Sequence, residues 1–143
     1  MNLVAIARHG IGVAGVPPLA IAIARGLAID IVRHAEPQAL VVQAAGPDAE
    51  AVWLTRLRAD LRRAPLPPGI AFALRVANGA SVVGSLLVAE RETDLGDRPG
   101  AVVRIGLEAI ELDRRDGSAT VPVAPTFVGL GQAEVLVREL SGR

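Results

Sequence analysis

The stretch AEAVWLTRLRADLRR, residues 49–63, has the clearest helical spacing in the chain, and the other segments are interpreted around it. Its arginines lie opposite a stripe of apolar side chains, which consists of Val52, Trp53, Leu54, Leu57 and Leu61. Asp48 offers a side-chain N-cap, and the prolines that follow at 65, 67 and 68 end the pattern. We therefore predict an amphipathic helix that packs one face against a sheet.

Short apolar segments on both sides of this helix have the length and residue types of strands. These expected strands cover residues 2–11, 27–32, 39–44 and 70–76. The last of them alternates strictly, with Ile70, Phe72, Leu74 and Val76 on one face. Each strand is expected to contribute to a single antiparallel sheet.

A second, more apolar helix is expected over residues 18–25. Pro17 and Pro18 suit its first turn, and Gly26 offers a left-handed C-cap. The order β-α-β-β-α-β over residues 2–77 then predicts an α+β protein with a ferredoxin-like N-terminal half, both helices covering one face of the sheet.

The C-terminal half, residues 78–143, reads as a β-hairpin-rich extension that ends in a short helix. Its expected strands cover residues 82–90, 101–112 and 120–123. Arg114–Gly117 is typical of a hairpin turn, and the last helix is expected to begin near Gly131. We place a boundary between residues 77 and 78, and the sequence leaves open whether the extension joins the same sheet.

The composition excludes several classes of function. Fifteen arginines balance fifteen acidic residues, so the net charge is zero and we expect no nucleic-acid partner. Lysine is absent, and we attribute the exclusive use of arginine to codon usage. Cysteine is absent and only two histidines are present, so we expect no metal and no cofactor. The uncharged run near the N-terminus, residues 10–24, is too short for a membrane span, which predicts a cytoplasmic protein without a membrane partner.

Two short strings contain an arginine followed by a histidine. Arg8-His9-Gly10 and Arg33-His34-Ala35-Glu36 resemble the signatures of the histidine phosphatase family, in which the histidine is phosphorylated and the arginine holds the phosphate. That chemistry requires a second histidine, and none follows His34. The candidate catalytic residues are therefore His9, His34, Arg8 and Arg33, provided that both histidines reach one pocket.

The N-terminal half also resembles the ACT domains of aspartate kinases. The resemblance lies in residues 26–32, 39–42 and 48–61, and in the turn Gly15-Val16-Pro17 before the first helix. It implies an amino-acid effector bound at that turn, between paired domains. The ligand-binding residues that we expect on this basis are Gly12, Gly15, Val16, Pro17 and Asp30.

The same stretch has a weaker similarity to a degenerate acylphosphatase domain. The catalytic arginine of that family would fall at Val16-Pro17, and its catalytic asparagine at His34. Since neither residue type is present there, the similarity implies the fold and not the activity.

One further cluster carries charge. Glu90, Glu92, Asp94 and Asp97 alternate with arginines near one expected loop, which we interpret as a solvated loop. Without a convincing catalytic set, and with 51% hydrophobic residues, we predict a non-enzymatic ligand-binding or assembly module. It would form a homo-oligomer or dock on a partner protein, and bind a small anionic or amino-acid ligand. The alternative is a small enzyme acting on an anionic substrate through Arg8/His9 and Arg33/His34.

Overall fold

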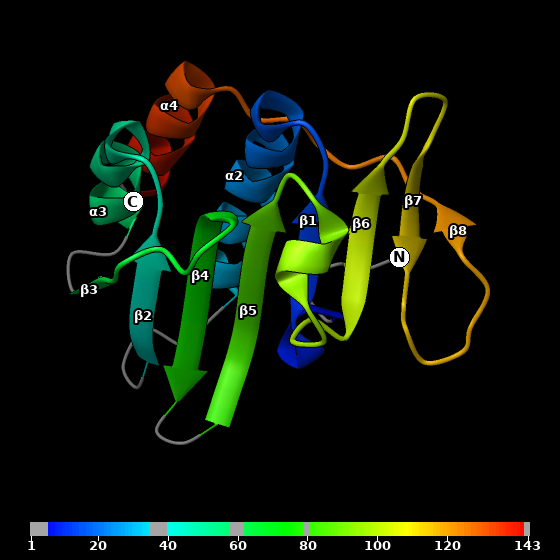
Figure 1. Cartoon of the computed structure of the whole chain (residues 1–143). Coiled ribbons are helices and arrows are strands. Elements are labelled where there is room, and N and C mark those ends of the chain that lie inside the picture. The colour runs from blue at the N-terminus through cyan, green and yellow to red at the C-terminus, as the bar shows by residue number, and fades with distance from the viewer. Residues whose placement is uncertain (1–5, 35–39, 58–61, 79–80, 142–143) are drawn as a thin grey trace.

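A computed structural model describes residues 6–34, 40–57, 62–78 and 81–141, and their architecture is α+β (Figure 1). The strands are β1 (Ile11–Ala14), β2 (Leu40–Ala45), β3 (Arg62–Arg63), β4 (Ile70–Asn78), β5 (Ser81–Ala89), β6 (Ala101–Ile105), β7 (Ile110–Asp113) and β8 (Val121–Pro122). The helices are α2 (Pro17–Arg33), α3 (Ala51–Leu57) and α4 (Leu130–Ser141), with 3-10 turns η1 (Ala7–His9), η2 (Asp48–Glu50) and η3 (Glu92–Leu95). All three α-helices cover one face of the sheet, while η3 lies on the other face (Figure 1).

The described strands form one mixed sheet in the order β3-β2-β4-β5-β1-β6-β7-β8. Strand β1 runs parallel to both of its neighbours, so that Ile11 pairs with Leu86 of β5 on one side and with Ala101 of β6 on the other. Strands on both sides of residue 78 therefore share a sheet. The boundary between residues 77 and 78 stays a prediction.

The strand expected over residues 27–32 is wrong, because this segment is the C-terminal half of α2. A short apolar run has no period that separates a buried strand from a buried helix. Helix α2 is apolar nearly all round because it lies between the sheet and other parts of the chain. With this strand gone, the described elements do not follow the β-α-β-β-α-β order on which the ferredoxin-like and ACT interpretations depend.

Gly26 does not end a helix, which corrects a second expectation. Residues 126–128 run against α2 at this point, and the Val128 N–H donates to the Ala22 carbonyl at 3.0 Å. A Cβ added to Gly26 would lie 3.3 Å from Val128 Cγ2 and 3.4 Å from the Thr126 carbonyl oxygen. Gly26 lies within a helix and allows residues 126–128 to approach it closely.

Two other boundaries differ from expectation. The described part of the strand predicted over residues 2–11 is largely the 3-10 turn η1, and β1 begins only at Ile11, where the predicted strand was expected to end. The helix predicted over residues 49–63 is confirmed over Ala51–Leu57, but Arg62–Arg63 pair with β2 as a strand. Residues 58–61 lie outside the described part of the chain.

The remaining predicted elements are confirmed with small shifts. They are the strands β2, β4, β5 and β8, the helix α4, and the segment 101–112, which is two strands, β6 and β7, rather than one. Strands β7 and β8 form the expected hairpin around Arg114–Gly117. Strong alternation and turn residues made these segments easier to predict than the buried helix.

The main core lies between the sheet and the three helices. Trp53 of α3 and Phe72 of β4 are fully buried, and their rings stack with centroids 6.4 Å apart. Glu50 is buried beside them with 3% of its surface exposed. Its carboxylate accepts hydrogen bonds from Trp53 Nε1 at 3.0 Å and from Arg25 Nε and Nη2 at 2.7 and 3.0 Å.

Arg25 links this carboxylate to a distant part of the chain. Its Nη1 donates to the Val128 carbonyl at 3.1 Å, so one guanidinium ties α2 to both η2 and the segment before α4. A buried carboxylate is tolerated when its charge is paired and its oxygens accept hydrogen bonds. Here both conditions hold.

We predict that Glu50→Gln lowers the free energy of unfolding by about 3 kcal/mol, because it leaves the largely buried Arg25 without its countercharge. Glu108→Gln, at an exposed position, is the matched control. Urea denaturation of both variants and the parent chain measures the difference. Equal midpoints for the two variants would show that the buried pair does not hold the helices together.

Candidate functional site

A hollow on the helix-free face of the sheet collects basic side chains from separate segments. We call it the arginine pocket; its volume is about 240 Å³ and it is lined by Arg8, His9, Gly10, Arg75, Val82, Ser85 and Arg98. The lining residues come from η1, from the adjoining strands β4 and β5, and from the loop before β6.

The register of the sheet places these segments side by side, at the same height along the strands. Ile11 lies beside Leu86 and Ala101, so the residues just before β1 lie near Ser85 of β5 and Gly100 at the start of β6. Ser85 in turn pairs with Arg75 of β4. Arg75 alternates with the buried Leu74 and Val76, and therefore projects from the face opposite the helices.

A β-bulge adds the apolar wall of the pocket. The β4–β5 register shifts between Val76 and Ala77, and Val82 thereby becomes the partner of Ala77. Ala77 is two residues from Arg75 in the same strand and lies on the same face. The bulge thus turns Val82 toward the arginine pocket, where 37% of its surface is exposed.

Two glycines let η1 and the loop before β6 approach closely. A Cβ on Gly10, whose φ is +84°, would lie 3.2 Å from Pro99 Cα, and a Cβ on Gly100 would lie 2.9 Å from the His9 carbonyl oxygen. The Gly100 N–H donates to that same oxygen at 2.9 Å. This contact fixes Arg8 and His9 beside Arg98.

The guanidinium groups of Arg8, Arg75 and Arg98 form no ion pair with any residue in the described parts of the chain. All three side chains are exposed, while Ser85 is half-buried between them. Like charges gathered in one hollow repel one another, and an anion that enters relieves the repulsion. Since guanidinium matches the geometry of oxyanions, the pocket can hold an anion through several charge-assisted hydrogen bonds.

An ion-pair network holds the loop that carries Arg98. Arg115 Nη1 donates to the Gly96 carbonyl at 2.6 Å and to the Pro99 carbonyl at 3.3 Å, on either side of Arg98. Arg115 also contacts Glu92, 3.5 Å from Nη2 to Oε2. The network therefore positions one wall of the pocket without lining it.

Arg104 completes this network from β6. It pairs with Glu92, its Nη2 lying 2.9 Å from Oε2, and the same Nη2 lies 2.6 Å from Asp113 Oδ2. The predicted solvated loop is exposed at Glu90, Asp94 and Asp97, as expected, and Glu92 anchors it to Arg104 and Arg115. Leu95, fully buried on the sheet at the end of η3, anchors it further.

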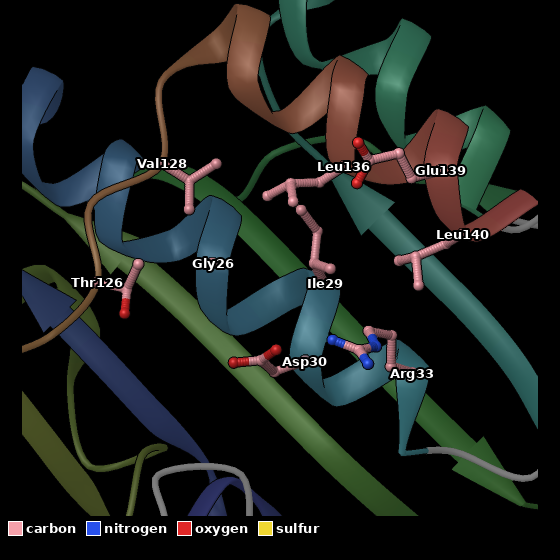
Figure 2. A pocket seen from close by; sticks show the side chains of 9 residues that line it. All are labelled: Gly26, Ile29, Asp30, Arg33, Thr126, Val128, Leu136, Glu139 and Leu140. Carbon is pink, nitrogen blue, oxygen red and sulfur yellow. The ribbon is translucent and has the colours of Figure 1, made fainter.

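A second hollow lies between α2 and α4, with a volume of about 320 Å³; we call it the α2–α4 groove. Figure 2 shows Asp30 and Arg33 on α2, with Leu136, Glu139 and Leu140 on α4 across from them. Ile29 and Val128 are buried at its base. Two carboxylates and one guanidinium thus border an apolar floor.

The predicted site residues do not come together. Arg8 and His9 line the arginine pocket, whereas Arg33 and Asp30 line the α2–α4 groove. His34 follows α2, and its Nδ1 lies 2.7 Å from the Asp30 carbonyl oxygen. The structure therefore separates the two arginine–histidine strings that the enzyme hypothesis joins.

Neighbouring side chains pack closely against the two glycines of the predicted effector turn. A Cβ on Gly12 would lie 2.8 Å from Leu95 Cδ1, and one on Gly15 would lie 2.6 Å from Ile105 Cβ. Val16 is exposed as the N-cap of α2, and Pro17 is its first residue. The missing side chains of these two glycines thus leave space for Leu95 and Ile105.

The sequence did not suggest Arg75, Ser85 or Arg98 as site residues. Arg75 interrupts an apolar alternating strand with a charge, which marks the solvent-facing side but does not tell which other segments meet it. Arg98 lies in a loop whose position depends on the register of β1 and β6.

No protein-family model, curated protein or solved structure matches this chain. Within residues 6–34, 40–57, 62–78 and 81–141, no group of three or more histidine or acidic side chains is placed to hold a metal ion. Across these same ranges, every helix is too short or too polar to cross a bilayer.

The network near η3 predicts acid sensitivity. The hydrogen bond from Arg104 holds the pKa of Glu92 below its ordinary value of 4.5, and the Arg115 N–H, followed by Arg104, lowers the pKa of Asp113 from 3.8. A depressed carboxylate pKa contributes stability above the unfolded value, which is lost as the pH falls through the folded value. The free energy of unfolding is expected to fall below about pH 4.5, and less steeply in Glu92→Gln.

Chemical denaturation at a series of pH values measures both slopes. Glu108→Gln, which removes an exposed carboxylate outside the network, should keep the slope of the parent chain. Parallel curves for the parent chain and Glu92→Gln would contradict the role of the network.

Proposed function

We propose that this chain is a non-enzymatic ligand-binding module that holds a small anion in the arginine pocket. The observation that supports it is the convergence of Arg8, Arg75 and Arg98, none with an ion-pair partner in the described part of the chain, on one hollow. The chain as a whole has a formal net charge of zero. Such a local excess of positive charge attracts an anion that the chain does not itself provide.

The binding function is favoured over the enzyme alternative because His9 and His34 do not line one pocket. General acid–base catalysis by two histidines requires that both imidazole rings lie within hydrogen-bond reach of one substrate. His34 lines neither this pocket nor the α2–α4 groove, and Arg33 belongs to the groove. Arg8 and His9 are therefore retained as anion-binding residues, without a catalytic role.

The other predicted partners have less support. Asp30, Arg33 and Glu139 around an apolar floor would match the two charges of an amino acid, so the α2–α4 groove is where that ligand is proposed. Large exposed apolar side chains such as Val16, Leu107 and Val135 lie in separate segments of the chain. Self-association, docking on a partner protein and a cytoplasmic location stay predictions of the sequence.

Sulfate tests the proposed function directly. Sulfate should stabilise the parent chain by about 1.4 kcal/mol when its free concentration is ten times Kd, because it binds only the folded state. Arg75→Ala should weaken sulfate binding about tenfold, since it removes one charged hydrogen-bonding partner. Thermal denaturation at constant ionic strength measures both effects.

Arg56→Ala is the matched control, because Arg56 is an exposed arginine on α3, on the other side of the sheet. Sulfate also stabilises proteins in general by exclusion from their surface, and this part is common to all variants. Equal sulfate responses in Arg75→Ala and Arg56→Ala would refute anion binding at the arginine pocket.

A further inference from the structure

From the way the arginine pocket is built, we infer that its ligand is a phosphoryl dianion carried on a small organic group, that is, a phosphate monoester. This inference rests on the proposed anion binding and names the chemical class of the anion. It follows from the number of charges, the segments that carry them and the apolar wall.

The charges favour a dianion over a monoanion. Three arginines line the arginine pocket, and none of its lining residues in the described part of the chain is acidic. A monocarboxylate would leave two of these positive charges uncompensated, whereas a phosphate monoester carries close to two negative charges above its second pKa, which is about 6. The ligand that relieves more of the mutual repulsion binds more tightly.

The segments that carry the donors favour a tetrahedral group, because they lie on different sides of the pocket. Arg75 comes from β4 on one side of Ser85, while Arg8 and Arg98 come from segments that precede β1 and β6 on the other side. A phosphoryl group presents three strong acceptor oxygens that point in different directions. Each arginine can therefore serve one oxygen, and the Ser85 hydroxyl at the floor can donate a further hydrogen bond.

The apolar wall favours an ester over free phosphate. Val82 borders the same hollow, and its partly exposed side chain offers a surface to an organic group and not to a charge. A volume of about 240 Å³ leaves room beside the phosphoryl group. Burial of such a group against Val82 adds affinity in proportion to the apolar area covered.

Matched small probes test the inference, with dissociation constants measured by calorimetry at constant ionic strength and about pH 8, where the monoesters are dianions. Methyl phosphate should bind at least about tenfold more tightly than methyl sulfate and dimethyl phosphate, which have a similar shape and one charge less. Propyl phosphate should bind more tightly than inorganic phosphate, and Val82→Ser should remove that preference.

The outcomes separate the two proposals. If methyl sulfate binds as tightly as methyl phosphate, the dianion class is overturned while anion binding stands. Equal binding of dimethyl phosphate would instead indicate a phosphodiester, the chemistry of a nucleic-acid backbone. Equal binding of inorganic and propyl phosphate, unchanged in Val82→Ser, overturns the organic carrier.

A variant on the pocket floor gives a second readout. Ser85→Ala should weaken methyl phosphate binding several-fold through the lost hydroxyl. Thr120→Ala, which removes an exposed hydroxyl near β8, should leave it unchanged. If no probe binds and neither sulfate nor Arg75→Ala has an effect, the proposed function itself fails.

Discussion

The insertion of β1 between β5 and β6 is the constraint on which the rest of this structure depends. Four residues, Ile11–Ala14, pair in parallel with strands that lie about 75 and 90 positions further along the chain. This pairing joins the beginning of the chain to its second half. It also carries η1 to the end of the sheet where Ser85, Arg75 and the loop before β6 meet, so the pairing that completes the sheet also assembles the arginine pocket.

The two faces of the sheet are held by different interactions. On the helical face, Glu50 accepts hydrogen bonds from Arg25 and Trp53 inside a core of aliphatic side chains. On the other face, Leu95 of η3 is buried against the sheet, and Arg104 and Arg115 hold the adjoining loop through Glu92 and backbone carbonyls. The interactions on the helical face hold the helices to the sheet. Those on the other face leave part of the sheet exposed to solvent, and the arginines of the arginine pocket border this part.

Local patterns predicted many elements but not their arrangement. Strict alternation in β4 and the helical spacing in α3 follow from one buried face, and such patterns are readable from the sequence. Helix α2 is buried on nearly every side, so residues 27–32 have no period that separates helix from strand. Gly26 resembled a C-cap because its contact with Val128, about 100 residues away, cannot be seen locally. Two of the seven lining residues, Arg8 and His9, were among the predicted site residues, but Arg75 and Arg98 join the pocket only through strand register.

The most direct test of the central claim is to observe the arginine side chains while an anion is added. In mildly acidic buffer at constant ionic strength, the Nε–Hε resonances of ¹⁵N-labelled protein can be followed during titration with sulfate. Arg8, Arg75 and Arg98 should shift along one saturating curve with a common Kd, while Arg56 and Arg114 remain in place. Shifts of all five arginines in proportion to sulfate, without saturation, would contradict a pocket assembled by the register of β1.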